Sequence, residues 1–219
     1  MLIKNGRSNF IMNNIITAKP NSPALEKIIK GAAILFVSKG YKNTSVRDIA
    51  RHCGISLGAL YHYIKSKEDI LNLFREATMV NIVNYTEKQT LELGKLNPTE
   101  ALKQGIFQYI DFVDYFQDVI LFWTRDSISL SKEQLNLLIA QEELLSRAFE
   151  KVLELGCSSG DFEIENVCVT ASNIISLCDS WALKRWFIRK RMTLATFKKH
   201  QINMILQGIL RRSDEGTKQ

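Results

Sequence analysis

Hydrophobic residues recur three and four positions apart along most of the chain, and no stretch alternates strictly between hydrophobic and polar residues. This spacing predicts helices throughout, and therefore an all-α fold. The first clear helix should open at Ser22-Pro23, because serine caps helix N-termini and proline fits the first turn. It should end at Gly40, after a buried stripe formed by Leu25, Ile28, Ile29, Ala32 and Phe36.

Residues 44–67 predict two short helices, a tight turn between them, and the beginning of a third helix. Thr44 or Asn43 can cap the first helix, and Ser56 can cap the second. Gly54 lies between them, where a residue without a Cβ atom accepts positive φ at little cost. The arrangement predicts a helix-turn-helix, and the polar and aromatic side chains of its second helix are typical of a nucleic-acid reader.

The rest of the chain predicts longer helices. A capping-box-like start at Ser66 to Asp69 opens a helix that continues without a breaker to about Leu93, and residues 94–97 form a linker. The remaining helices are expected from Asn97-Pro98 onward, from Ser131 to Gly156, from about 164 to 188 and from about 194 to 210.

Charge is distributed unevenly over the 219 residues, whose formal net charge is +6 at pH 7. Residues 1–67 carry eleven Lys and Arg and two acidic residues, a net charge of +9. Residues 68–219 carry eighteen basic and twenty-one acidic residues, a net charge of −3. The positive charge accompanies the helix-turn-helix, which indicates a polyanionic partner at that end of the chain.

Other classes of protein fit the sequence poorly. No window approaches the ~20 continuous apolar residues of a membrane span, and the N-terminus lacks the apolar core of a signal peptide. We therefore expect a cytoplasmic protein with no membrane association. The four cysteines include no C-x-x-C pair, and two of the three histidines fall in the helix-turn-helix. Without a nucleophile elbow, a phosphate loop or metal-ligand spacing, we expect no catalytic residues, no metal and no cofactor.

Two segments, AAILFVSKGYKNTSVRDIA and GISLGALYHYIKSKEDIL, carry a more specific signal. Through them, residues 25–74 closely resemble the N-terminal DNA-binding domain of TetR/AcrR-family transcription regulators, although His62-Tyr63 departs from the commoner order at that point. The resemblance implies a three-helix head joined by a long helix to a C-terminal helical domain for ligand binding and dimerisation. The implied domains are a flexible arm at 1–21, a DNA-binding domain at 22–67 and an effector-binding and dimerisation domain at 68–219.

The resemblance also implies which residues contact double-stranded DNA. Thr44 and Ser45 would bind a phosphate, and Arg47 is the candidate for a bidentate guanine contact. Tyr61 could instead pack partly inside the head. The other small, polar or cationic residues expected at the DNA are Ser56, Leu57, Gly58, Ala59, Tyr61, His62, Tyr63, Lys65 and Lys67. The arm at 1–21 would either enter the minor groove or be disordered.

Members of this family are two-fold dimers, so the resemblance implies a homodimer on a palindromic operator. The last two helices are the expected interface, because the first of them has an apolar stripe wider than one side of a monomer core needs. The alternative is that this stripe packs within the monomer. The interface residues expected are Val167, Ala171, Ile174, Ile175, Cys178 and Leu206.

An aromatic cluster at residues 107–123 is a candidate lining for an effector cavity, or else plain core. Its apolar character would suit a hydrophobic or amphipathic effector, with an acyl-CoA as one candidate. The basic run at 184–191 would then either contact the CoA phosphates or be a solvated helix end. The lining residues expected are Phe107, Ile110, Phe112, Phe116, Trp123, Leu145, Phe149, Trp181 and Arg185. Leu177, four positions before Trp181, is not expected to line this cavity.

The sequence therefore predicts a ligand-responsive transcriptional repressor that leaves its palindromic operator when the effector tilts the long helix at 68–93. Two alternatives stay open. One is a transcriptional activator, and the other is an effector-independent DNA-binding protein of the nucleoid type.

Overall fold

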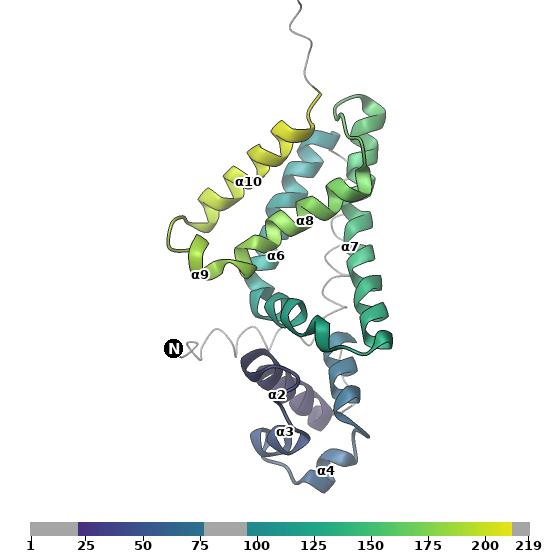
Figure 1. The fold of residues 1–219 in the computed structure, drawn as a ribbon, viewed down its shortest axis with the longest axis vertical. Helices are drawn as coiled ribbons and strands as arrows, with labels where there is room; N and C mark the ends of the chain where they lie inside the picture. The colour runs from purple at the N-terminus through teal and green to yellow at the C-terminus, as the bar shows by residue number, and fades with distance from the viewer. Residues whose placement is uncertain (1–21, 77–95, 212–219) are drawn as a thin grey trace, which may run out of the picture. The chain divides into compact units, whose positions relative to one another are not determined.

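The computed structural model describes residues 22–76 and 96–211, and every regular element in these ranges is helical (Figure 1). This confirms the predicted all-α fold. The predicted arm at 1–21, the later part of the predicted long helix and the start of the predicted linker lie outside the described residues. None of the helices within 22–76 and 96–211 is long and apolar enough to cross a membrane.

The described residues contain eight labelled α-helices, one 3-10 turn and one unlabelled helical segment. Residues 67–76 are helical and carry no label in Figure 1. The labelled helices are α2 (Pro23–Lys39), α3 (Val46–Cys53), α4 (Leu57–Tyr61), α6 (Pro98–Asp126), α7 (Lys132–Ser159), α8 (Val167–Leu183), α9 (Arg185–Ile188) and α10 (Leu194–Ile209), and a 3-10 turn η1 (Ser127–Ser129) lies between α6 and α7.

The described residues form two compact units, and the helices α6 and α7 each contribute to both. The first unit contains residues 22–76 and 118–141, and the second contains residues 96–117 and 142–211. The domain boundaries taken from the sequence stay predictions.

Most of the predicted helix caps are present. The Ser22 hydroxyl accepts the backbone N–H of Ala24, and Ser56 accepts that of Ala59 at 3.1 Å. The expected cap of α3 at Thr44 or Asn43 is wrong. Ser45 is the N-cap instead, and it exchanges hydrogen bonds with Asp48 in a full capping box.

Two helices differ from their sequence-based bounds. The helix expected at 164–188 begins at Val167, because the Asn166 side chain accepts the N–H of Val169, and it stops at Leu183. Lys184 leaves helical geometry with φ −112° and ψ 25°, so α9 is a separate short helix. The helix expected to end at Gly156 continues to Ser159.

Aromatic rings form the core of the first unit. Phe36 of α2, Phe74 of the helical segment 67–76, and Phe122 of α6 are fully buried, with ring centroids 5.6 to 6.4 Å apart. Trp123 stacks on Phe74 at 5.6 Å. Trp123 therefore belongs to this core, whereas Phe112 and the other expected cavity residues lie in the second unit, so the place of Trp123 in a cavity stays a prediction.

Polar side chains of α6 form hydrogen bonds with the backbone at the C-terminal end of α2. The Asp126 carboxylate accepts the backbone N–H of Tyr41 at 3.0 Å, and Arg125 donates to the Phe36 carbonyl oxygen at 3.0 Å. Arg125 and Asp126 also pair with each other at 2.7 Å. The Phe36 carbonyl oxygen thus accepts hydrogen bonds from both Arg125 and the Gly40 N–H, and Asp126 holds the backbone just after the helix, so these bonds stabilise the end of α2.

The second unit holds the other expected cavity residues. Phe112 packs against Phe116 at 4.5 Å between ring centroids, and α6 departs from helical geometry at Phe116, with φ −97° and ψ 15°. Phe107 is half exposed on the surface under the Lys198 ammonium, which contradicts its expected place in a cavity wall. The buried members of the set are Ile110, Leu145, Phe149 and Trp181.

Leu177 is partly exposed, and its carbonyl oxygen accepts hydrogen bonds from the Ser180 hydroxyl at 2.6 Å and from the Gln201 side chain of α10 at 3.3 Å. Through its backbone, Leu177 joins α8 to α10.

The residues expected at a dimer interface are mostly inside the single chain. Val167 is partly exposed. The side chains of Ala171, Ile174, Ile175, Cys178 and Leu206 are at most 6% exposed. A partner cannot cover a side chain that its own chain already covers, so these five residues are wrong choices for an interface, and Val167 stays a prediction. The apolar stripe of α8 faces the core of the second unit.

A hydrogen-bonded pair lies within the second unit. The Tyr109 hydroxyl of α6 donates to the Asp179 carboxylate of α8 at 2.9 Å. Burial raises the pKa of Asp179 to about 7, and nearby Glu142 adds to this shift while the Tyr109 hydrogen bond opposes it. The fold therefore favours the protonated form of Asp179.

Replacement of Asp179 with Asn should remove a pH dependence of stability. The pKa of this carboxyl rises from 3.8 to about 7 on folding, so the folded wild type binds more protons than the unfolded chain between these values. Its free energy of unfolding should fall as the pH rises from 4 to 7, by at most about 1.4 kcal/mol per pH unit. Denaturant unfolding of both proteins measures the difference, and parallel profiles would contradict the assignment.

Candidate nucleic-acid interface

The turn between α3 and α4 fixes the angle of the helix-turn-helix. Gly54 adopts φ 62° and ψ 37°, a left-handed conformation that glycine accepts without strain, as predicted. Ile49 of α3 and Leu60 of α4 are fully buried. At Gly31 of α2, an added Cβ would collide with the Cys53 sulfur, so this glycine allows α2 and α3 to pack closely.

The second helix of the motif exposes most of its surface. α4 has five residues, and Leu60 is the one that is buried. Gly58 and Ala59 are exposed, and a Cβ added at Gly58 would meet nothing within 4 Å. The backbone of α4 is therefore accessible to a close approach by a ligand, as base-edge contacts in a major groove require.

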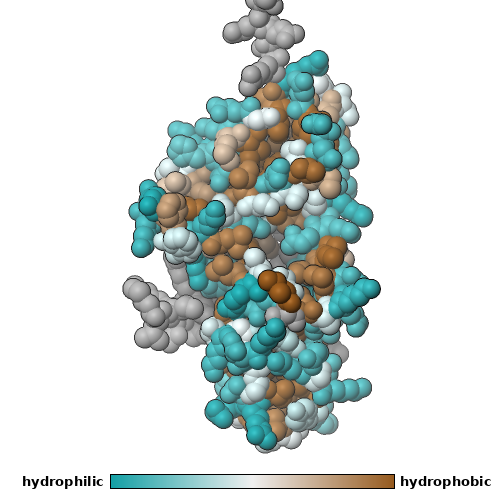
Figure 2. Space-filling view, in the orientation of Figure 1, coloured by the Kyte–Doolittle hydropathy of each residue, from teal (hydrophilic) through white to brown (hydrophobic). Residues whose placement is uncertain are grey.

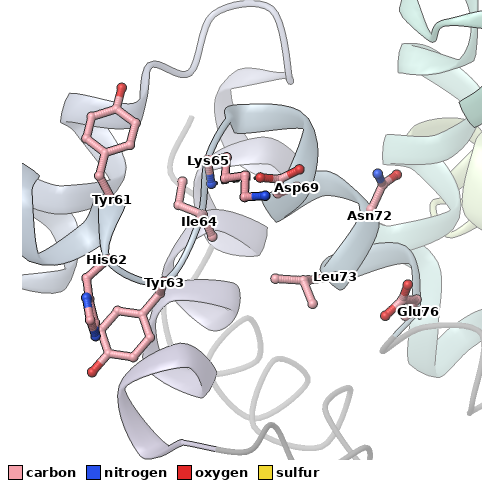
Figure 3. A pocket seen from close by; sticks show the side chains of 9 residues that line it. All are labelled: Tyr61, His62, Tyr63, Ile64, Lys65, Asp69, Asn72, Leu73 and Glu76. Atoms are coloured by element: carbon pink, nitrogen blue, oxygen red, sulfur yellow. Dashed lines mark hydrogen bonds between the residues drawn. The ribbon is translucent and has the colours of Figure 1, made fainter.

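Aromatic and basic side chains surround this exposed helix. Tyr61, His62, Tyr63 and Lys65 are all exposed, and Tyr61, which is 49% exposed, keeps about half of its surface accessible to a ligand. In Figure 3 the rings of His62 and Tyr63 lie side by side, with their centroids 5.4 Å apart, whereas Tyr61 points in a different direction. Arg47 is exposed on α3. These groups can donate hydrogen bonds to phosphates, and Arg47 can also read a base edge.

An open pocket of about 490 Å³ lies beside these residues (Figure 3). The Asp69 carboxylate accepts the backbone N–H groups of Lys65 at 2.7 Å and Ser66 at 3.0 Å, which holds the loop after α4 in place. The loop therefore presents its side chains from a fixed backbone. The pocket is lined by Tyr61, His62, Tyr63, Ile64, Lys65, Asp69, Asn72, Leu73 and Glu76.

Two residues expected at the DNA serve the fold instead. Thr44 is 1% exposed, and its hydroxyl donates to the carbonyl oxygen of Gly40 at 2.8 Å. The Lys67 ammonium donates to the carbonyl oxygen of Tyr41 at 3.1 Å and lies over the Tyr41 ring. The expected phosphate contacts of Thr44 and Lys67 are therefore wrong, because the hydroxyl and the ammonium group that would make them bind backbone carbonyl groups of the first unit.

The hydrogen bonds of Ser45 make its expected contact with a DNA phosphate less favourable. Ser45 is exposed, but its hydroxyl donates to the Asp48 carboxylate at 2.7 Å. The Ser45 hydrogen bonds hold the pKa of Asp48 below its usual value, so this carboxylate is ionised near neutral pH and would repel a phosphate. Ser56 is exposed and Leu57 is partly exposed, so DNA could reach both residues, as their expected role requires.

Sequence reasoning missed Arg51 as a further basic residue of this face. Its side chain is 81% exposed and lies 3.7 Å from the Asp48 carboxylate. The signal was present in the spacing, because Arg51 follows Arg47 by four residues and such residues share one face of a helix. Among the residues that the structure describes, no cluster of three or more His, Cys, Asp or Glu could hold a metal ion.

Comparison with known proteins agrees with this geometry. A family model described as "Bacterial regulatory proteins, tetR family" matches residues 28–73. A second, described as "Tetracyclin repressor-like, C-terminal domain", matches residues 95–209. The HTH-type transcriptional regulator HbdR of Aromatoleum sp. (strain CIB) is 27% identical over 186 residues, which cover 84% of this chain and 80% of HbdR.

Solved structures share the fold at low sequence identity. The FadR regulator of Bacillus subtilis, in complex with stearoyl-CoA, has a TM-score of 0.66 at 18% identity, over 83% of this chain and 97% of FadR. AibR, in complex with isovaleryl coenzyme A and operator DNA, has a TM-score of 0.67 at 22% identity, again over 83% of this chain and 97% of AibR. These likenesses show the fold alone.

Replacement of Arg47 with Ala should lower the affinity for the preferred DNA sequence by about tenfold or more, and lower that for random DNA less, because a bidentate guanine contact discriminates by ~1–3 kcal/mol. Fluorescence anisotropy on labelled duplexes measures both affinities. Lys151→Ala, which removes an exposed cation of α7, is the control and should bind both duplexes as the wild type does. An equal loss on both duplexes would make Arg47 a phosphate contact only.

Proposed function

Because the chain belongs to the TetR family of bacterial transcriptional regulators, we propose that it is a repressor that binds a palindromic operator as a homodimer and leaves it when an amphipathic effector binds. Proteins of this family bind DNA and are not enzymes. The observation that carries the proposal is the exposed face of the helix-turn-helix, where Arg47, Tyr63 and Lys65 surround a helix with an accessible backbone.

The exposed face divides into base-reading and phosphate-binding residues. Gly58 and Ala59 would approach base edges and thymine methyl groups, while Arg47 would contact a guanine. Tyr61, Tyr63 and their neighbours His62 and Lys65 would bind the sugar-phosphate backbone. The net charge of +9 over residues 1–67 supports this proposal, since neutralised phosphates release counterions and favour binding at low salt.

An acyl-CoA thioester is the effector that we propose. FadR and AibR carry stearoyl-CoA and isovaleryl coenzyme A in their structures, and they share the fold of this chain. The partly exposed rings of Phe112 and Phe116 offer apolar surface for an acyl chain in the second unit. Phe149 and Trp181 of the expected cavity set are buried by the chain itself, so the accessible apolar surface comes from Phe112 and Phe116.

Helix α6 supplies a covalent route for the signal. It carries Phe112 and Phe116 in the second unit, and then Phe122 and Asp126 in the first. The backbone leaves helical geometry at Phe116, between these two parts of α6. A ligand that alters α6 there would act on the contacts that Asp126 makes with the end of α2.

A saturating acyl-CoA should stabilise the protein and release it from DNA. At 100 times its dissociation constant, a ligand that binds the folded chain alone adds ~2.7 kcal/mol to the free energy of unfolding. A thermal-shift screen of acyl-CoAs against matched free fatty acids measures stabilisation, and anisotropy on DNA-bound protein measures release. If none of the acyl-CoAs stabilises the protein, this effector class is wrong, and the DNA-binding assignment is unaffected.

The proposed homodimer would use the exposed sides of α8 and α10. On α8, Val169 is 52% exposed, and Ser172 and Ser176 follow on the same face. On α10, Met204 is half exposed and Gly208 has open space beside it. Small side chains let helix backbones approach closely, so this mixed face would suit helix packing against a second copy.

Val169→Asp should convert the dimer to a monomer and lower operator affinity, because it places an unpaired charge in the proposed interface. The chain itself should still fold, since Val169 is 52% exposed within it. Sedimentation equilibrium measures the oligomeric state. The control is Ile128→Asp at the η1 turn, where Ile128 is also exposed, and this variant should stay a dimer. If Val169→Asp also stays a dimer, the proposed interface is wrong.

The two alternatives predict different observations. An effector-independent DNA-binding protein would bind with steep salt dependence and no preferred sequence. An activator would bind the same operator but raise transcription from the adjacent promoter. A reporter gene fused to the selected operator distinguishes activation from repression.

A further inference from the structure

One part of the second unit is strongly basic. Residues 180–213 contain nine Lys and Arg and no Asp or Glu. Over the whole of residues 68–219, acidic residues outnumber basic ones, with twenty-one against eighteen. The basic charge of the second unit is therefore concentrated in α9, α10 and the residues next to them.

Some of these cations are used within the second unit. Arg189 pairs with Asp114 of α6 at 2.6 Å and lies over the Trp181 ring, and Lys198 pairs with Asp111 at 2.5 Å. Arg185 donates to the Gln117 side chain at 3.3 Å. The contacts of Arg185 and Arg189 hold α9 beside the segment of α6 that carries Phe116, and the Lys198 pair holds α10 beside the same helix.

Lys184, Lys190 and Arg191 lie on the surface together with two exposed rings. Trp186 is 70% exposed and Phe187 is 43% exposed, and the Arg191 guanidinium lies 3.7 Å from the Phe187 ring centroid. Among the residues that the structure describes, Lys184 and Lys190 have no acidic partner within 4 Å. We call Lys184, Trp186, Phe187, Lys190 and Arg191 the α9 surface; Figure 2 shows hydrophobic and hydrophilic side chains next to each other at the place of α9 in Figure 1.

We propose that the α9 surface binds the nucleotide end of the CoA effector. This inference rests on the proposed function, since it assigns a second subsite to the same ligand. An exposed indole ring can stack on adenine, and Lys and Arg side chains can bind the phosphates of the 3′-phospho-ADP group. The contacts of Arg185 and Arg189 with α6 bring this surface to the helix that carries Phe112 and Phe116, where the acyl chain would lie.

An anionic membrane is the competing partner for a surface of aromatic and basic residues. Helices that lie in a membrane interface bury an apolar face that extends over several turns. α9 has four residues and its two exposed rings form one short patch, which matches the size of a single nucleotide better. Vesicle binding is therefore included in the test as an outcome that would overturn the proposal.

Tryptophan fluorescence of the full chain provides a direct readout. The chain has three tryptophans, and Trp123 and Trp181 are buried, so Trp186 is the one at the surface. Free coenzyme A should quench the fluorescence of the wild type, and Trp186→Phe should remove this quenching. Affinities for palmitoyl-CoA and for S-palmitoyl pantetheine, which lacks the nucleotide, are then measured for the wild type, Trp186→Ala and the double variant Lys190→Gln/Arg191→Gln.

The wild type should bind palmitoyl-CoA at least about tenfold more tightly than S-palmitoyl pantetheine, because stacking and phosphate contacts each contribute to binding. Both variants should lose this preference and keep the wild-type affinity for S-palmitoyl pantetheine. Lys199→Gln, which removes an exposed cation of α10 outside the α9 surface, should leave the preference unchanged.

The possible failures are distinguishable. If the wild type binds both thioesters equally and still releases DNA, the effector class stands and the nucleotide subsite is wrong. If neither thioester binds but free coenzyme A quenches Trp186, the subsite stands and the acyl-CoA effector is wrong. Absence of all three signals rejects both. If Trp186→Ala loses binding to phosphatidylglycerol vesicles and keeps the affinity for palmitoyl-CoA, the α9 surface is a membrane site.

Discussion

The burial of Phe36 against Phe74 and Phe122 is the contact on which the DNA-binding half of the molecule depends. The three rings come from α2, from the helical segment 67–76 and from the last turns of α6, and all three are fully buried. Burying one such ring contributes ~1.5–3 kcal/mol, and ring pairs add ~0.5–1.5 kcal/mol. By contrast, α4 buries Leu60 alone and needs the scaffold around it. The helix that would read DNA is thus held in place by residues that never reach it.

The same contact explains why α6 matters for regulation. Its last turns are part of the core of the first unit, and Asp126 and Arg125 complete the hydrogen bonds at the end of α2. Its earlier turns carry the aromatic rings of the second unit, with Phe116 out of helical geometry between the two parts. In this proposal an effector needs no contact with the DNA-binding residues, because one helix belongs to both cores.

Features set by neighbouring residues could be predicted from the sequence. The caps at Ser22 and Ser56, the turn at Gly54 and the helical fold follow from side chains within a few positions, and the structure confirms them. Contacts between distant residues could not be predicted in the same way. The Thr44 hydroxyl is drawn inward by carbonyl groups of Leu35 and Gly40, which leaves Ser45 as the cap. Lys67 is similarly bound to Tyr41, 26 positions away.

Hydrophobic periodicity also does not reveal which core a side chain joins. Trp123 and Phe116 lie on the same predicted aromatic stripe, yet they belong to different compact units. The stripe of α8 that includes Ile174 and Cys178 indicated a buried face correctly, but its cover is the chain itself. A pattern on one helix shows that a face is buried, and the identity of the covering surface depends on residues elsewhere.

Selection of bound duplexes from a random DNA pool by the full chain tests the central claim most directly. A dimer with one helix-turn-helix per subunit should enrich an inverted repeat, whose half-site centres lie about 10 base pairs or a multiple of that distance apart. Enrichment of no sequence, or of a single site without an inverted partner, would contradict the claim that this chain reads a palindromic operator as a dimer.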